Sequence, residues 1–414
     1  LFLATVDFKK AFDSVTHEAI WNAMVDQGVS TNYTTLLSKL YNNQTATVKT
    51  DCESRPFSIE RGVKQGDPLS SLLFNCVSES LMRKLKHKWE SKEWGVPLQP
   101  HTKTRLTNLR FADDILLTGT SLTHLMHMLS DLEMLANTVG LHIHPDKTKI
   151  LHNNVVSRTP RHVRTNTMEI EVLPTANSTK YLGRALSFCD PHRTELENRI
   201  AAAWKKFYKL KQELTGTRYS LNDRLRLFHG TVTPTILYGA EAWTLTTDLE
   251  NRLRRTQRQM LRMILHAPRR KHNTETQTRE RPTLDQHPDA QTNTDTSSSD
   301  DNDVDSTTTE TPMPPPPDEH DDAEIEPWSE WIKRSTREAE TRMSKLRLDD
   351  WVTMQRRRKW RWARKLVASD EFNWAKAPIQ WDPTIDPKLK PRRRPGRPKT
   401  RWTDDIRNYI LHTT

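Results

Sequence analysis

The chain has 414 residues, a formal net charge of +11 at pH 7 and a sequence pI near 9.5. This length leaves room for two or three domains, but only 34% of the residues are hydrophobic, so part of the chain is expected to lie outside any core. No apolar run approaches the roughly 20 residues that a membrane span needs, so we expect no membrane partner. The basic balance favours a polyanion such as nucleic acid, since binding releases counterions; an ordinary basic soluble protein is the alternative.

Residues 1–155 alternate strand-like and helix-like segments. Leu1 to Asp7 is an apolar run typical of a buried strand, and Leu106 to Thr118 predicts two short strands joined by a tight turn. Helices are expected from His17, behind the cap Thr16, to a stop at Gly28, from Pro68 behind the cap Asp67, and from Leu122 to Val139 ahead of Gly140. The fold class is therefore α+β, a small antiparallel sheet backed by helices. Because the chain begins with Leu rather than Met and a strand already starts at Leu1, we expect a further part of the protein to precede it.

The rest of the chain divides by composition. A connector at 156–190 leads to residues 191–270, whose helical apolar stripes predict an all-helical domain. Residues 271–326 are rich in Thr, Ser, Asp, Glu and Pro, which is typical of a disordered linker. Residues 327–414 are basic and hold eight of the 13 tryptophans, so a nucleic-acid-binding region is expected there, with no fold assigned.

Three cysteines, Cys52, Cys76 and Cys189, lie far apart in the sequence. Their spacing argues against a disulfide framework or a zinc site and favours a reducing, intracellular compartment.

Acidic residues follow two of the expected strands. Asp7 closes the first strand, and Asp113 and Asp114 occupy the turn of the later hairpin. Adjacent carboxylates repel each other, and a divalent cation relieves that repulsion because hard oxygen ligands suit Mg²⁺. Two such ions can activate an attacking oxygen and stabilise a leaving one in phosphoryl transfer. A solvent-exposed Asp-Asp turn is the alternative, and for the dipeptide alone it is the commoner case.

The neighbouring segments narrow the choice. In chain order they read Asp7-Phe8-Lys9-Lys10-Ala11-Phe12-Asp13, Gln65-Gly66-Asp67-Pro68-Leu69-Ser70, Phe111-Ala112-Asp113-Asp114, Gly140-Leu141 with Asp146-Lys147-Thr148, and Tyr181-Leu182-Gly183. This ordered set resembles motifs A to E of reverse transcriptases, most closely those of non-LTR (LINE-type) retrotransposons, and is also similar to group II intron enzymes. The resemblance covers about residues 1 to 190. The whole set is specific, whereas any single motif is not.

The resemblance implies a role for each matching residue. Asp7, Asp113 and Asp114 would be the catalytic triad that binds two Mg²⁺ ions, with Mn²⁺ as an alternative ion. Lys147 would be a general acid for the pyrophosphate leaving group, against the alternative of a solvated hairpin charge. The nucleotide-binding residues would be Lys10, Ala11, Phe12, Gln65 and Gly66, with Phe12 a steric gate against a ribose 2′-hydroxyl or, alternatively, a core residue. Tyr181, Leu182 and Gly183 would be the primer grip.

The later regions are also placed by this resemblance. Residues 1–155 would be the palm, with the fingers missing at its N-terminus, and residues 191–270 a thumb-like domain. Its candidate phosphate contacts are Lys205, Lys206, Lys209, Arg252, Arg254, Arg255 and Arg258. The C-terminal region contains a first basic run at 356–362, with Trp interleaved, and a second at 391–399. The second run resembles an AT-hook and also fits a nuclear localisation signal. Its nucleic-acid-binding residues would be Arg392, Arg393, Arg394, Arg397 and Lys399.

The function implied is RNA-directed DNA polymerisation, in which a primer 3′-hydroxyl attacks a deoxynucleoside triphosphate. The partners would be an RNA template and a DNA primer, and an endonuclease is expected elsewhere in the full-length polyprotein. We expect this chain alone to be weak or inactive, in the nucleus or cytoplasm, with the basic tail favouring the nucleus. The alternatives are a catalytically inactive nucleic-acid-binding remnant of a truncated element and, far behind, an unrelated hydrolase.

Overall fold

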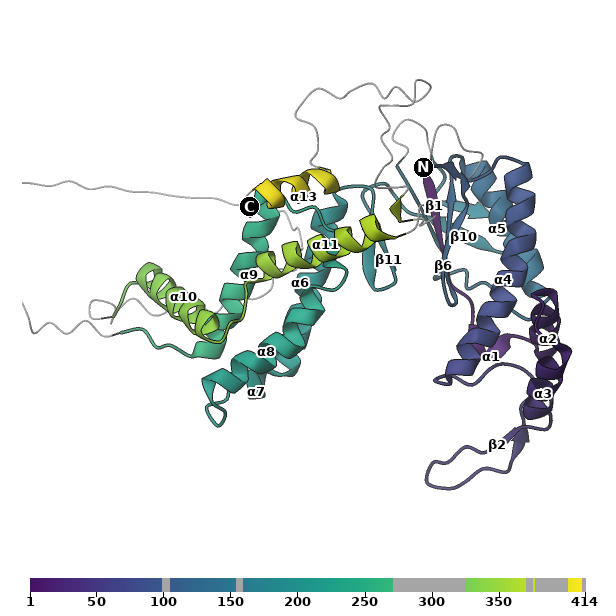
Figure 1. The fold of residues 1–414 in the computed structure, drawn as a ribbon, viewed down its shortest axis with the longest axis horizontal. Coiled ribbons are helices and arrows are strands. Elements are labelled where there is room, and N and C mark those ends of the chain that lie inside the picture. Colours follow the sequence, from purple (N-terminus) through teal and green to yellow (C-terminus); the bar gives the residue numbers. More distant parts are fainter. Residues whose placement is uncertain (99–104, 154–158, 271–324, 370–374, 377–400, 412–414) are drawn as a thin grey trace, which may run out of the picture.

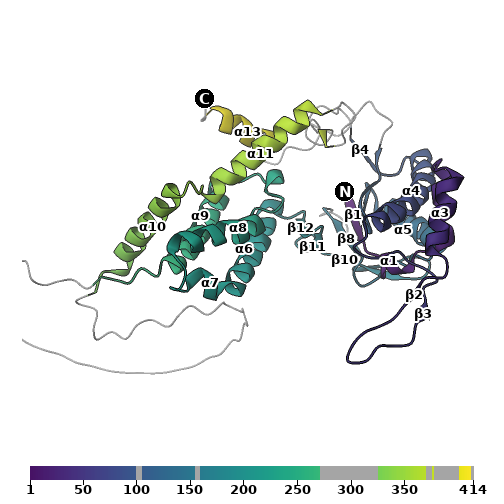
Figure 2. The same cartoon turned by 60° about the horizontal axis from the view of Figure 1, so that its bottom comes forward.

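The computed structural model describes residues 1–98, 105–153, 159–270, 325–369, 375–376 and 401–411. Two bodies of different architecture lie on either side of a β-hairpin (Figure 1). One, called here the sheet body, is built around a six-stranded sheet within residues 2–172. The other, the helical body, contains helices α6 to α11 and α13. Figure 2 shows the hairpin between them from a second direction.

The sheet body has the strand order β6-β7-β1-β8-β10-β9. All neighbours run antiparallel except β8 and β10, which are parallel. The strands are β1 (Phe2–Val6), β6 (Asn108–Phe111), β7 (Asp114–Gly119), β8 (Lys149–His152), β9 (His162–Arg164) and β10 (Glu169–Val172). Strand β1 is central and apolar, with Ala4 and Val6 buried, as the N-terminal run predicts.

Helices α4 (Pro68–Ser91) and α5 (Leu122–Asn137) lie beside the sheet (Figure 1). Helix α4 starts where its sequence predicts, because the Asp67 carboxylate accepts a hydrogen bond from the amide of Leu69 at 3.0 Å and Pro68 fixes the first turn. Helix α5 buries a full apolar stripe against the sheet. Helix α2 (His17–Asp26), capped by Thr16 as expected, packs on α4.

Shorter elements complete the sheet body. They are α1 (Ala11–Ser14), α3 (Thr31–Tyr41), and the two-stranded pairs β2 (Thr45–Ala46) with β3 (Phe57–Ser58) and β4 (Val96–Pro97) with β5 (Arg105–Leu106). The hairpin between the bodies consists of β11 (Ser178–Tyr181) and β12 (Arg184–Ser187). The mixed α and β character expected from the sequence is confirmed.

The helical body begins with helices from the expected all-helical region. They are α6 (Pro191–Lys209), α7 (Lys211–Thr215), α8 (Leu221–Ile236), the 3-10 turn η1 (Ala240–Ala242) and α9 (Thr247–Leu265). After residues 271–324 come α10 (Trp328–Lys345), α11 (Trp351–Ala368) and α13 (Trp402–Leu411). None of the helices within the described residues is long and apolar enough to cross a membrane.

One hydrophobic core unites the helices on both sides of residues 271–324. Trp351 is fully buried, stacks on Phe228 and donates its indole N–H to Thr233 at 2.9 Å. The amide of Glu326 donates to the carbonyl of Arg270 at 2.7 Å, so the two residues that flank 271–324 lie next to each other. Residues 328–352 therefore pack as part of the same body as residues 196–264, although their composition had set them apart.

Candidate active site

The strand end carrying Asp7 meets the hairpin carrying Asp113 and Asp114. Strand β1 pairs antiparallel with β7 in a register that places Val6 opposite Ile115. The next positions outward are Asp7 and Asp114, so both lie at one end of the same strand pair. Strands β6 and β7 pair up to Phe111 and Asp114, which leaves Ala112 and Asp113 as the turn. Long-range pairing thus brings together the acids that the sequence singles out.

The backbone around these acids is locally unusual. Ala112 has a φ of +52° and Lys10, three residues beyond Asp7, a φ of +45°, both in the left-handed region that residues with a Cβ seldom adopt. Such conformations cost energy and persist only where the surroundings impose them, often at functional sites. Beside Lys10, the backbone is held by the segment after Gly140: the amide of Lys9 donates to the carbonyl of His142 at 2.8 Å.

The carboxyl group of Asp114 is affected by its surroundings and by the other two acids. Partial burial, then the charges of Asp113 and Asp7, raises the pKa of Asp114 above its ordinary value. Within the described residues, however, no group of three or more His, Cys, Asp or Glu side chains is gathered so as to hold a metal ion. The acids fit a divalent cation in charge and donor type, since all three are carboxylates and therefore hard oxygen donors. The side chains as they lie are neighbours, not a closed ligand set.

Lys147 extends the site from a third segment. Its Nζ lies 3.5 Å from Asp7 Oδ2, and 59% of its side chain is exposed. The segment is held there by backbone bonds, because the amide of His144 donates to the carbonyl of Asp7 at 2.8 Å and Phe8 pairs antiparallel with Ile143. Gly140 permits this approach: its φ is +83°, and a Cβ there would lie 2.5 Å from the carbonyl oxygen of Ser14.

A cavity of about 490 Å³ opens beside Asp7. The residues that line it are basic or polar in type: Lys9, Lys10, Ser14, His142, His144 and Lys147. Of these, sequence reasoning had singled out only Lys10 and Lys147 for the site. The only sequence signal that could have indicated His142 and His144 is their closeness to Lys147 along the chain.

The other expected nucleotide-binding residues lie on the loops next to this corner. Phe12 is half-buried on α1 and stacks on Phe74 of α4, with ring centroids 4.8 Å apart. The carbonyl of Phe12 accepts from the amide of Val63 at 2.7 Å, which joins the loop after Asp7 to the loop before α4. On that second loop Gln65 and Gly66 are exposed, and Gln65 Nε2 lies 3.4 Å from Asp13 Oδ1. The packing of Phe12 is compatible with a gate and with a core residue alike.

Residues 2–186 match the family model described as reverse transcriptase (RNA-dependent DNA polymerase). These residues are a reverse transcriptase domain. A Pol polyprotein from the type-1 retrotransposable element R2 of Popillia japonica is 28% identical over 286 residues, which are 64% of this chain and 43% of that protein. A putative transposon-derived protein of Caenorhabditis elegans is 34% identical over 179 residues, which are 42% of this chain and 60% of that protein. The resemblance to non-LTR retrotransposon reverse transcriptases is thereby confirmed.

The relatives are longer than the matched region, and the chain spans less than half the length of the Popillia japonica protein. Among solved structures, apo telomerase from Candida tropicalis is similar at 13% identity with a TM-score of 0.36, covering 64% of this chain and 40% of that one.

The β11–β12 hairpin lies at the end of the matched residues 2–186 and carries the residues expected to form the primer grip. The hydroxyl of Tyr181 donates to the carbonyl of Leu109 on β6 at 3.4 Å. Burial, followed by the charge of Asp114, raises the pKa of Tyr181 to about 12, which places this phenol near the acidic corner. Leu182 and Gly183 form the turn and face the helical body instead.

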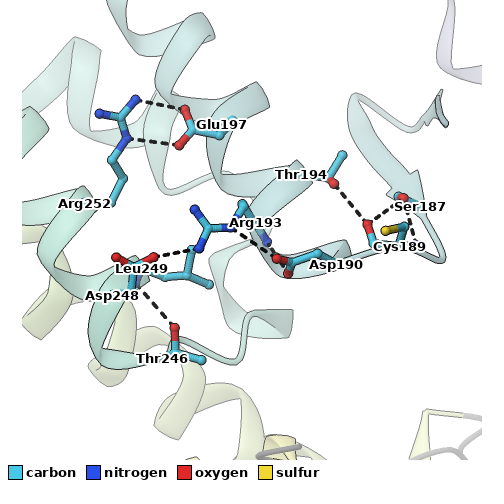
Figure 3. A network of polar contacts seen from close by, with 10 residues as sticks. All are labelled: Ser187, Cys189, Asp190, Arg193, Thr194, Glu197, Thr246, Asp248, Leu249 and Arg252. Atoms are coloured by element: carbon cyan, nitrogen blue, oxygen red, sulfur yellow. Dashed lines mark hydrogen bonds and ion pairs between the residues drawn. The ribbon is translucent and has the colours of Figure 1, made fainter. Parts of the chain in front are cut away.

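Several basic residues of the helical body are already paired within the protein. Arg252 makes a bidentate ion pair with Glu197, at 3.0 and 3.2 Å (Figure 3). Arg193 pairs with both Asp190 and Asp248. Arg258 pairs with Glu340 at 2.7 Å, and Arg254 lies 3.5 Å from Glu250. In contrast, Lys205, Lys209 and Arg255 are exposed. Within the expected set, Arg252, Arg254 and Arg258 thus pair with acids of the protein, Lys205, Lys209 and Arg255 face solvent, and Lys206 is half-buried.

The first basic run of the C-terminal region also serves packing. Lys359 is 2% exposed, donates to the carbonyl of Trp243 at 2.9 Å and pairs with Asp405 at 2.5 Å. Arg356 pairs with Glu250, and Arg358 donates to the carbonyl of Leu237. The second run, with its expected nucleic-acid-binding residues Arg392, Arg393, Arg394, Arg397 and Lys399, lies outside the described residues.

Proposed function

We propose that the protein containing this chain is an RNA-directed DNA polymerase of a non-LTR retrotransposon. It would add deoxynucleotides to a DNA primer 3′-hydroxyl on an RNA template. The sheet body would act as the palm and the helical body as the thumb that holds the template–primer duplex. The observation that carries the proposal is the register of β1 with β7, which puts Asp7 beside Asp113 and Asp114 within a domain of this family.

Asp7, Asp113 and Asp114 would hold divalent cations, Mg²⁺ in the first place. Bound there, the metal would lower the pKa of the attacking hydroxyl and offset charge on the leaving oxygen. The chain's own contribution is to hold the three carboxylates close together; burial, followed by the charges of Asp113 and Asp7, raises the pKa of Asp114. Because their repulsion is relieved by a cation, ion binding and the ordering of this corner would favour each other.

The remaining residues would orient the nucleotide. The left-handed turn at Lys10 opens toward the cavity beside Asp7, so the amides of Lys10 and Ala11 are candidate donors to the triphosphate. Phe12, fixed by its stack on Phe74, would exclude a ribose 2′-hydroxyl by contact. Gln65 and Gly66 would lie over the incoming base. Lys147 would give its proton to the pyrophosphate oxygen as the bond to the α-phosphorus breaks.

The exposed lysines of the helical body and the C-terminal basic run would contact the nucleic-acid backbone through charge. Nuclear location, expected from that run, stays a prediction.

Primer extension on an RNA template with Mg²⁺ tests the proposal. The chain, a version extended toward the N-terminus and an Asp113→Ala variant of the extended version would be compared, with Asp51→Ala as an exposed control far from the strand ends. We expect deoxynucleotide incorporation by the extended protein and its control, and its loss in Asp113→Ala. Failure of the extended protein to incorporate any deoxynucleotide would favour the inactive nucleic-acid-binding remnant instead.

A further inference from the structure

The turn of the β11–β12 hairpin is strained. It consists of Leu182 and Gly183, with φ values of +49° and +72°. Two left-handed residues are what a tight two-residue hairpin turn requires, and glycine adopts that conformation freely. Leucine does not, because its Cβ crowds the following carbonyl. A leucine held there implies that contacts outside the hairpin fix the turn.

Side chains of the helical body supply those contacts. The hydroxyl of Tyr238, just beyond α8, donates to the carbonyl of Leu182 at 3.1 Å. The carbonyl of Gly183 accepts from the guanidinium of Arg199, and the amide of Asn198 lies 3.5 Å from the same oxygen. The Arg199 guanidinium also lies over the Tyr238 ring, 5.2 Å from its centroid. Both exposed carbonyls of the turn are thus held from one side.

A buried carboxylate stands behind this arrangement. Glu195 on α6 is 1% exposed, and its Oε2 accepts from the amide of Ala185 on β12 at 2.6 Å. Its Oε1 lies 3.2 Å from Nε of Arg199 and 3.6 Å from Nε of Arg184. A buried acid is retained at such a position only when cations and donors compensate its lost hydration. Glu195 therefore orients Arg199, which binds the turn, and it also attaches strand β12 to helix α6.

The opposite end of the turn reaches the sheet body. Tyr181 donates to the carbonyl of Leu109 on β6, the strand that ends in the Asp113 turn. The hairpin therefore touches the helical body through Leu182, Gly183 and Ala185, and the acidic corner through Tyr181.

We propose that Tyr238, Arg199 and Glu195 are positioning residues that clamp the hairpin turn to the helical body. The clamp makes the hairpin follow the body that holds the template–primer duplex, and Tyr181 carries that position to the carboxylates. The clamp sets where the primer 3′ end lies, not how the nucleotide binds. The inference rests on the proposed polymerase function for its kinetic consequence, but not for the clamp itself.

Tyr238→Phe tests the clamp most gently, because it removes one hydroxyl and keeps the ring beneath Arg199. Tyr208→Phe is the matched control, since Tyr208 lies 56% exposed on α6. In the extended protein, Tyr238→Phe should raise the KM for an RNA template annealed to a DNA primer about three- to tenfold, the effect of one lost hydrogen bond. The KM for the deoxynucleotide and the unfolding midpoint should stay those of the control.

Two further measurements complete the test. Tyr181→Phe should give the same KM pattern, and the double variant should be no worse than the worse single one, because both act along one line of contacts. Hydrogen exchange at the amide of Ala185 should quicken in Arg199→Gln and not in Tyr208→Phe. Equal increases in the KM for the annealed template–primer and in the KM for the deoxynucleotide would overturn the clamp as a positioning device. An unchanged KM for the template–primer would overturn it as well. If the unsubstituted protein extends no primer, the proposed function fails, and unchanged exchange at Ala185 would independently refute the clamp.

Discussion

The ammonium group of Lys147 lies 3.5 Å from a carboxylate oxygen of Asp7, although the two residues belong to opposite ends of the sheet body's sequence. The contact exists because the Gly140–Asp146 segment pairs with the backbone of Asp7 and Lys9. Strand β8, which begins two residues after Lys147, also pairs with β1 and places Lys149 opposite Thr5.

Lys147→Ala should slow nucleotide incorporation about 100-fold, the usual scale of a positioned general acid. Lys147→Arg should recover little, because a guanidinium does not release its proton near neutral pH. Single-turnover incorporation measures this, with Asp146→Ala as the control on the same segment. Stability should hardly change, since an exposed pair contributes at most about 1 kcal/mol. Unaltered single-turnover rates in Lys147→Ala would leave the residue a solvated charge.

Gly140→Ala should damage the site far more than Gly28→Ala. Both glycines have a positive φ, +83° and +80°, so an alanine pays the same conformational penalty of roughly 1 kcal/mol at either position. At Gly28 a Cβ meets nothing within 4 Å, whereas at Gly140 it would lie 2.5 Å from the Ser14 carbonyl. The Gly140 segment must therefore shift and move Lys147 from Asp7. Primer-extension rates and urea unfolding of both variants measure the difference; equal behaviour would contradict it.

Trp351→Ala should destabilise the helical body by about 3–5 kcal/mol, the typical cost of removing a buried tryptophan. The substitution leaves a cavity beside Phe228 and removes the donor to Thr233. Urea unfolding followed by circular dichroism measures the change. Trp328→Ala, at a position 60% exposed, is the control and should cost under 1 kcal/mol. Similar costs for the two variants would mean that residues after 327 are not part of this core.

Acid should loosen the start of α10. Hydrogen bonds from Arg334, then the backbone of Arg270 and the charges of both arginines, lower the pKa of Glu326 to about 2. A lowered carboxyl pKa adds stability that is complete above the unfolded value near 4.5 and disappears as the pH falls toward 2. The unfolding midpoint should therefore drop between pH 4.5 and 2 more steeply in the unsubstituted protein than in Glu326→Gln. Glu330→Gln, with its exposed carboxyl, should keep the steep slope.

The sequence alone determined the local elements, and it predicted which residues form the site. Thr16 and the Asp67-Pro68 pair predicted where α2 and α4 begin, because capping depends on residues within one turn. Spacing and order of the five motifs indicated the reverse transcriptase domain, since those motifs are themselves short runs of neighbours.

Only the tertiary structure decided which distant residues meet. It joined Trp351 to Phe228 across residues 271–324, where composition had indicated a boundary. It also engaged Arg252 with Glu197, and placed Arg199 on the turn at Gly183, where the sequence shows only a charged helix face. Partners of this kind are chosen by packing and loop closure over long separations, and no periodicity along the chain records them.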